Sequence, residues 1–310
     1  QHPVQHPVQH PQHLPQQAGL LSWSALHPHC CSLCLQLATP LWLPFLIFFN
    51  LLFEADAVSY LTALLSPLCR LLFGASKDGS FAIISGFLCG FPMGSKSCLE
   101  LVKRQKIKKE EAAYLVSFCN NASPAFVVSF LCHGIFFGEK GLLFPILFSF
   151  YMAPLLTGIL FRFLFFRKHE NLFIPPIPTS LHKATPIFQF QSFDHAIMNS
   201  FQTIVRLGGY ITFFAVLSSF IQSAKFLPIP LRLFFTAFIE LTTGASLLGK
   251  MKVSLKLRVI AVCACISFGS LSGFAQSYTL LKEGEISARY YLAGKITACI
   301  LCTIFLSILL

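Results

Sequence analysis

The stretch SFCNNASPAFVVSF (residues 117–130) is largely apolar, yet two adjacent amides, a serine and a proline interrupt its middle. Ser123 followed by Pro124 is a typical helix start, with serine as the N-cap and proline at the first helical position. We therefore expect one helix to end before Asn120 and a second helix to begin at Pro124. The new helix directs unpaired N–H groups at whatever lies before it, and Asn120 and Asn121 add amide donors and acceptors. The alternative is a simple loop between two short helices.

The composition around this stretch is that of a membrane protein. Of the 310 residues, 55% are hydrophobic and 11% are charged, and the mean hydropathy is +0.69. A soluble domain usually carries about a quarter charged residues. Lipid cannot satisfy bare backbone groups, so spanning segments are helices or closed barrels, and the apolar runs here exceed the roughly 10-residue strands of barrels. The sequence predicts an all-α integral membrane protein, with the lipid bilayer as one partner.

The formal net charge of +11 is concentrated between apolar segments, at residues 103–109, 167–168 and 250–258. Lys and Arg in short loops mark the cytoplasmic side of a membrane protein. The basic runs lack the interleaved aromatic residues that stack on bases, so we expect no nucleic-acid partner. We expect residues 111–137 to form one interrupted crossing, and residues 141–166, 201–221 and 233–249 to form three more. All three basic segments are then cytoplasmic, and the loops at 138–141 and 282–289 lie on the opposite side.

Interrupted helices recur in the same order along the chain. GFPMGSK (90–96) precedes CNNASP (119–124), and ELTTGAS (240–246) precedes SFGSLSGFAQ (267–276). Paired interrupted helices in matching positions of two halves are typical of transporters with inverted repeats and a binding site at the bilayer midplane. The sequence therefore predicts a multi-span bundle with inverted repeats, broken helices and re-entrant hairpins.

A Pro-rich basic loop separates the two predicted membrane repeats. Residues 37–166 form the first repeat, residues 167–191 the cytoplasmic loop, and residues 192–310 the second repeat. Residues 1–36 begin with a Gln-His-Pro repeat, whose composition does not pack a core, so we expect a disordered or aberrant N-terminus. The Cys31-x-x-Cys34 spacing in this segment suits a metal, but a structural zinc site normally pairs two such motifs, so we expect no metal site.

Three charged residues lie within or beside apolar segments: Glu240, Arg206 and Lys96. Ionisable residues inside a membrane are functional candidates because lipid makes them costly. Two structural alternatives stay open, namely an ion pair between Glu240 and an Arg or Lys, and a Lys96 side chain that extends to the cytoplasmic surface. We find no phosphate loop, metal-ligand pair or hydrolytic triad, and expect neither an enzyme nor a cofactor.

Four motifs together, GFPMGSK, KKEEAAYLVSFCNNASPAF, IELTTG and SFGSLSGFAQ, resemble the YlbJ-type sporulation integral membrane proteins, which carry the nucleoside-recognition or Gate domain. The likeness extends over roughly residues 40–310. It implies a fold like that of concentrative nucleoside transporters. It also implies a place in the bacterial cell membrane, at the outer forespore membrane during sporulation, and transport of dipicolinic acid out of the mother cell.

The resemblance also implies a substrate-binding region drawn from all four motifs. Helix N-termini and basic side chains fit a small planar dianion, beside which Phe91 can stack. Two other functions stay open: a non-transporting scaffold or receptor in spore assembly, and a nucleoside carrier. The coupling ion, proton or sodium, and homo-oligomer formation are also left open. The expected substrate-binding residues are Gly90, Phe91, Pro92, Gly94, Lys96, Asn120, Asn121, Ser123, Pro124, Glu240, Gly244, Ser270, Ser272 and Gln276.

Overall fold

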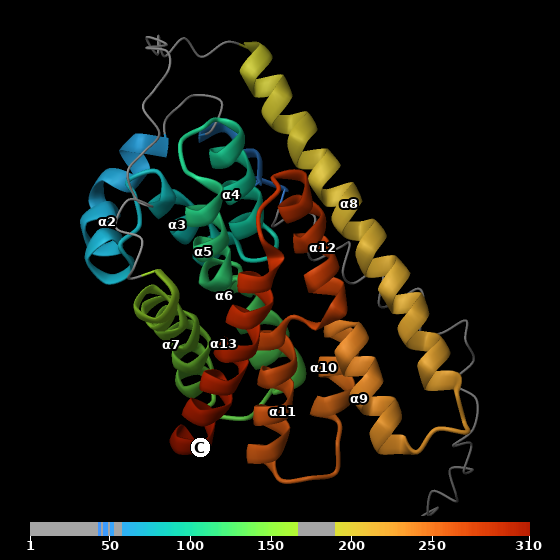
Figure 1. Ribbon diagram of the computed structural model, residues 1–310. Helices are drawn as coiled ribbons and strands as arrows, with labels where there is room; N and C mark the ends of the chain where they lie inside the picture. The colour runs from blue at the N-terminus through green and yellow to red at the C-terminus, as the bar shows by residue number, and fades with distance from the viewer. Residues whose placement is uncertain (1–42, 45, 49, 53–57, 167–189) are drawn as a thin grey trace, which may run out of the picture.

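The computed structural model describes residues 43–44, 46–48, 50–52, 58–166 and 190–310 (Figure 1). The expectations for residues 1–36, including the Cys31-x-x-Cys34 motif, lie outside this part of the chain, as does nearly all of the 167–191 loop. Within the described residues every regular element is a helix and no strand is present, which confirms the all-α prediction.

The helices of the first half are short and frequently interrupted. They are α2 (Val58–Phe73), α3 (Gly79–Cys89), α4 (Met93–Lys103), α5 (Lys109–Cys119), α6 (Pro124–Phe126), the π-helix η1 (Val127–Ile135), α7 (Leu143–Phe161) and the π-helix η2 (Arg162–Phe166). Those of the second half are α8 (Phe190–Ser223), α9 (Ile229–Ile239), α10 (Leu241–Gly249), α11 (Leu255–Phe268), α12 (Ser270–Glu283) and α13 (Ala288–Leu309).

Five helical segments of the described chain are long and apolar enough to cross a membrane. The shortest have 22 residues, which at about 1.5 Å per residue span about 33 Å, enough for a hydrocarbon core of about 30 Å. On α13 the exposed side chains Ile296, Ile300 and Ile304 recur every fourth residue and form an apolar stripe suited to lipid. The chain is therefore an integral membrane protein. The five segments are Lys109–Ile135, Leu143–Leu164, Phe193–Ser223, Leu255–Glu283 and Ala288–Leu309.

Two pairs of short helices fold back on themselves instead of crossing. In the first pair α3 and α4 have 11 residues each and meet at Gly90, whose φ is 79°. In the second pair α9 and α10 meet at Glu240, whose backbone is extended (φ −129°, ψ 126°). A side chain at Gly244 would collide with the Ala237 backbone, so the chain reverses direction between these residues. The expectation that residues 233–249 form one crossing was wrong, because the reversal at Glu240 leaves two helices that each reach about half of a bilayer.

Ion pairs between loops overturn the expected topology. Lys103 Nζ lies 2.6 Å from Glu283 Oε1, and Lys109 pairs with Glu285. The 103–109 segment therefore lies beside the 282–289 loop, which we had placed on the opposite side. At the other end Arg258 pairs with Glu139 at 3.6 Å. Since residues 233–249 double back, residues 250–258 lie at the end opposite to residues 103–109.

The Lys109–Glu285 pair has an electrostatic consequence at this loop. The Lys109 ammonium, which donates a hydrogen bond to Glu285, holds the pKa of this exposed carboxyl below its ordinary value. The pair is solvent-accessible on both sides, so water and salt screen it strongly. The pair shows that the loops carrying Lys109 and Glu285 are neighbours, and it contributes little to stability.

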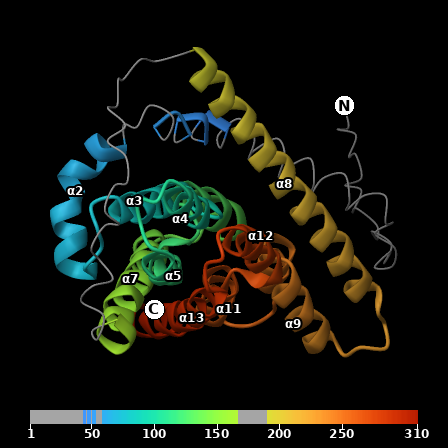
Figure 2. The ribbon, with the colours of Figure 1, turned by 45° about the horizontal axis from the view of Figure 1, so that its top comes forward.

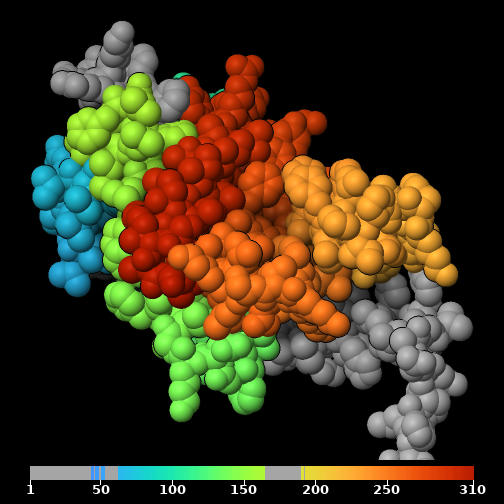
Figure 3. All heavy atoms as spheres, turned by 90° about the horizontal axis from the view of Figure 1, so that it is seen from below, coloured from blue at the N-terminus to red at the C-terminus, as the bar shows by residue number. Residues whose placement is uncertain are grey.

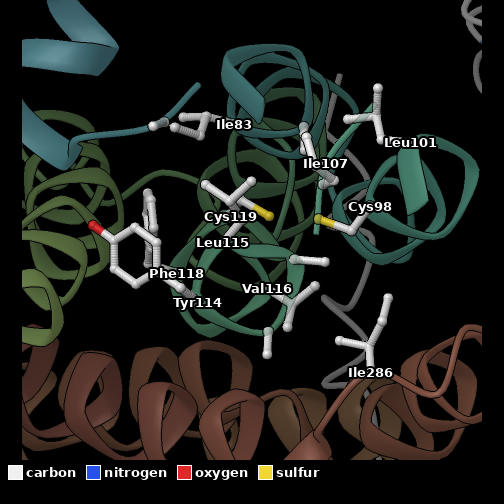
Figure 4. Close-up of a cluster of buried hydrophobic side chains, with 14 of the residues drawn as sticks. Ile83, Cys98, Leu101, Ile107, Tyr114, Leu115, Val116, Phe118, Cys119 and Ile286 are labelled. Carbon is white, nitrogen blue, oxygen red and sulfur yellow. The ribbon is translucent and has the colours of Figure 1, made fainter. Parts of the chain in front are cut away.

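Helix α5 lies at the centre of the first half and is covered on all sides. Figure 4 shows its side chains, among them Tyr114, Leu115 and Phe118, directed toward several surrounding helices. Tyr114 Oη donates to the carbonyls of Phe73 and Gly158, both at 3.0 Å, and so satisfies a buried hydroxyl between α2 and α7. Every residue of α5 from Glu111 to Cys119 is buried, so α5 forms the core that positions the break at its own C-terminus.

Helix α13 from the end of the chain packs directly on α5. A side chain at Gly294 would collide with the Ser117 carbonyl, so the two backbones touch without an intervening side chain. Small residues of this kind allow close helix packing in membranes. Seen from the end that carries the C-terminus, α13 lies beside α11 (Figure 3). Helix α8, with 34 residues, runs along the outside beside α9 and α12 (Figures 1 and 2).

The loop pairing predicts which segments share a side of the membrane. We expect Arg104→Cys and Lys282→Cys to react with a membrane-impermeant maleimide from one side of sealed, oriented vesicles. Lys140→Cys and Lys252→Cys should react from the other side. The parent chain provides the background for its native cysteines. Labelling of Lys252→Cys from the same side as Arg104→Cys would restore the topology expected from charge alone.

Candidate functional site

The interruption at residues 120–123 has the expected cap. Helix α5 ends at Cys119 and α6 begins at Pro124, with Ser123 as N-cap in an extended conformation. Ser123 Oγ accepts a hydrogen bond from the Phe126 backbone N–H at 3.2 Å. This confirms the predicted helix restart, with serine as cap and proline at the first helical position.

The turn of the α3–α4 hairpin packs on this interruption, backbone against backbone. A Cβ atom at Gly90 would lie 2.6 Å from the Ser123 nitrogen, and one at Gly94 would lie 2.7 Å from the Cys119 carbonyl oxygen. One at Gly86 would collide with the same carbonyl. Only glycine permits these approaches. The GFPMGSK and CNNASP motifs, about 30 positions apart, therefore form one unit.

The two asparagines at the interruption have different partners. Asn120 Nδ2 donates to Ser277 Oγ at 2.6 Å and to Tyr291 Oη at 3.4 Å, which ties the break to α12 and α13. Asn121 Nδ2 caps the end of α5 by donating to the Phe118 carbonyl at 2.6 Å. Asn120 Oδ1 is buried and accepts no hydrogen bond from any described residue. The break therefore holds one acceptor that is left unsatisfied at depth.

Glu240 closes the α9–α10 hairpin as a helix cap. Its carboxylate accepts hydrogen bonds from the backbone N–H of Thr242 at 3.0 Å and of Thr243 at 2.6 Å, and from Thr242 Oγ1 at 3.0 Å. A negative charge is favourable at the N-terminus of α10. In the described part of the chain no Arg or Lys forms an ion pair with Glu240. The structure therefore does not show the structural ion pair that was the alternative for this residue.

The interruption between α11 and α12 lies against both hairpins. Gly269 has a φ of 90°, and a Cβ there would lie 3.2 Å from the Phe91 ring. The next residue, Ser270, donates from Oγ to the Ala237 carbonyl of α9 at 2.6 Å. Ser272 is also buried, within the first turn of α12. The second break therefore connects the turn of one hairpin to the end of the other.

Lys295 joins these parts and was missed by the sequence analysis. It belongs to α13, is 3% exposed, and its Nζ lies 3.4 Å from both Asn121 Oδ1 and the Ser267 carbonyl. The Phe91 ring centroid lies 4.3 Å from the same Nζ, in cation–π geometry. The available signal was a single lysine inside the apolar segment 290–310.

A polar cavity of about 190 Å³ lies between α4, α8 and α12. Lys96 is buried at its wall and donates from Nζ to Thr203 Oγ1 at 2.8 Å, so the interpretation that Lys96 extends to the membrane surface was wrong. Arg206 of α8, an exposed residue, lines the same cavity. Its functional role stays a prediction. Residues lining the cavity include Pro92, Lys96, Asn199, Gln202, Thr203, Arg206, Tyr210 and Gln276.

The candidate residues thus form neighbouring groups and not one pocket. Gly90, Phe91, Gly94, Asn120, Asn121, Ser123 and Pro124 belong to the unit made by the first hairpin turn and the first break. Pro92, Lys96 and Gln276 line the cavity. Glu240, Gly244 and Ser270 lie at the second hairpin turn. Their roles in substrate binding stay predictions.

Comparison with known proteins identifies a bacterial membrane protein whose sequence is similar to this chain. The chain is 26% identical over 301 residues to the sporulation integral membrane protein YlbJ of Bacillus subtilis (strain 168). The alignment covers 87% of this chain and 73% of the relative, and confirms the resemblance indicated by the four motifs. No family model matches the chain, and no solved structure matches it.

The cap geometry predicts the effect of Glu240→Gln. The amide retains one acceptor oxygen, but its NH₂ group cannot accept the second backbone hydrogen bond. We expect the free energy of unfolding to fall by about 1–2 kcal/mol, as for loss of a helix cap or a buried hydrogen bond. Thermal unfolding in detergent provides the measurement. Glu139→Gln, which changes a half-exposed ion pair, should cost less than about 1 kcal/mol. Equal effects of the two variants would argue against the capping role.

Proposed function

We propose that this chain, which belongs to the YlbJ-type family of sporulation integral membrane proteins, is a membrane carrier and not an enzyme. Its substrate is a small anionic metabolite. Dipicolinic acid, moved out of the mother cell across the outer forespore membrane, is the compound we infer from the family resemblance. The observation that carries the proposal is the cationic cavity beside the broken helices.

The charge in this cavity suits a dicarboxylate. Its wall holds the cations Lys96, Lys103 and Arg206 against the carboxylates Glu100 and Glu283. Glu283 is already bound by Lys103, which leaves the cations Lys96 and Arg206 against the carboxylate of Glu100. The remaining lining has a positive net charge and favours anions. Lys96 and Arg206 come from different helices, α4 and α8, and can each bind one carboxylate. The volume of about 190 Å³ corresponds to about six water molecules at roughly 30 Å³ each.

The order of the helices supports alternating access. A hairpin followed by an interrupted helix occurs as α3–α4 with α5–α6, and again as α9–α10 with α11–α12. Such paired elements are typical of carriers with inverted repeats, in which one part moves against the other around a central site. We infer the same arrangement here, with a fold like that of concentrative nucleoside transporters.

One observation favours the alternative of a non-transporting scaffold or receptor. The breaks are packed shut, since Asn120 is 0% exposed and Asn121 is 7% exposed. A scaffold needs no opening at these positions. A carrier in a closed state has the same packing, so ligand binding separates the two functions.

Ligand-dependent stability is the test of the proposal. A carrier is stabilised by its substrate, by about 2.7 kcal/mol at 100 times the dissociation constant. We expect dipicolinate to raise the thermal midpoint of the purified protein, and uridine at equal concentration to leave it unchanged. Lys96→Met and Arg206→Met should each weaken dipicolinate binding about 10- to 100-fold, since a charged hydrogen bond contributes about 1.5–3 kcal/mol.

The control for charge is Lys252→Met, an exposed lysine away from the cavity, which should bind dipicolinate as the parent does. Stabilisation by uridine alone would favour a nucleoside carrier. A folded protein that responds to neither compound would favour the scaffold. Proteoliposome transport addresses the break separately, because undiminished transport by the Asn120→Ala, Asn121→Ala double variant would remove those residues from the site.

A further inference from the structure

Lys295 is a buried cation at the point where both interrupted helices and one hairpin turn meet. Its ammonium group lies 3.4 Å from Asn121 Oδ1 at the first break and 3.4 Å from the Ser267 carbonyl at the second. The Phe91 ring of the α3–α4 turn lies on the same group, 4.3 Å from Nζ to the centroid. Three segments far apart in the chain therefore direct electron-rich groups at one positive charge.

The groups around Lys295 are those that bind a cation, and all three are neutral. An amide oxygen, a backbone carbonyl and an aromatic face each attract positive charge without supplying a negative one. Among the residues that the structure describes, no carboxylate lies within ion-pair distance of Lys295. A buried ammonium without a counter-charge is costly, so its position at this junction needs a reason beyond packing.

The helix ends at this junction reinforce the preference for positive charge. The Ser267 carbonyl belongs to the last turn of α11, whose C-terminus carries the negative end of the helix dipole. Asn121 lies two residues beyond Cys119, the last residue of α5. In carriers with broken helices, carbonyls and C-terminal ends at such interruptions coordinate the coupling cation. Here the oxygens that would do so already bind Lys295.

We propose that the ammonium group of Lys295 is a resident cation in the place of a coupling metal ion, so that the carrier binds and moves its anion without Na⁺. The part of the inference that concerns Na⁺-independent transport rests on the proposed function. The part that concerns the cation site rests on the oxygens of Asn121 and Ser267. A Na⁺ ion at these oxygens would meet the Lys295 charge at close range. The lysine therefore excludes the metal that the site otherwise attracts.

Removal of the charge at constant side-chain length is the decisive change. Lys295→Met leaves the two oxygens without a cation, and Na⁺ can then enter. In choline chloride we expect this variant to transport dipicolinate in proteoliposomes at least tenfold more slowly than the parent, and NaCl at equal ionic strength to recover part of the rate. The parent rate should agree within twofold between the two salts. Lys256→Met, the same substitution at an exposed lysine of α11, should behave as the parent does.

Thermal stability tests the cation site without reference to transport. NaCl should raise the thermal midpoint of Lys295→Met relative to choline chloride, and should not raise that of the parent or of Lys295→Arg. If no anion is bound or moved by the parent, the proposed function fails, while this Na⁺-dependent shift still decides the cation site.

Three results would overturn the inference. They are a parent protein whose transport or stability depends on Na⁺, a Lys295→Met variant that transports in choline chloride as fast as the parent, and a folded Lys295→Met variant that Na⁺ does not stabilise. The first result needs no substitution, and it decides the matter even where Lys295→Met does not fold.

Discussion

The fold depends on satisfying a helix that is opened inside the membrane. At the end of α5 the backbone leaves the helix, and lipid offers nothing to its free polar groups. The protein covers this opening with the α3–α4 turn, whose glycines bring backbone within contact of Cys119 and Ser123. From the other side α13 touches the Ser117 carbonyl through Gly294. The surrounding helices are arranged so that this one interruption is enclosed by protein.

The charges at the breaks follow the direction of the helix dipoles. Glu240 is at the N-terminus of α10, where its carboxylate accepts hydrogen bonds from two backbone N–H groups. Lys295 is at the C-terminal ends of α5 and α11, where its ammonium group faces oxygens. Each charge has the sign that its helix end favours. This explains how the protein buries Glu240 and Lys295 without pairing them to each other.

Features encoded by neighbouring residues could be predicted from the sequence, whereas features set by distant contacts could not. The cap at Ser123 and Pro124 depends on local chemistry, and the five apolar spans depend on length and composition. The interruption at residues 240–246 was predicted, but the topology still treated residues 233–249 as a crossing because they are apolar enough to be a span. A single extended residue, Glu240, turns them into a hairpin. That error reversed the side assigned to residues 250–258. Lys295 was missed because its partners come from residues more than 20 positions away.

The packing also indicates which helices belong to the buried core and which lie at its edge. Leu281, Ile286 and Tyr291 from the second half belong to the same buried cluster as α5, and α13 contacts both α5 and α7. The two halves of the sequence are therefore not separate bodies. By contrast, α8 exposes large apolar side chains along its length and encloses the cavity from outside, with Thr203 bound to Lys96. Besides the hydrogen bond between Lys96 and Thr203, α8 is bound to α12 by one between Tyr210 Oη and Thr279 Oγ1. If the proposed carrier opens this cavity by moving α8, both hydrogen bonds must break, while the break around Asn120 remains within the core.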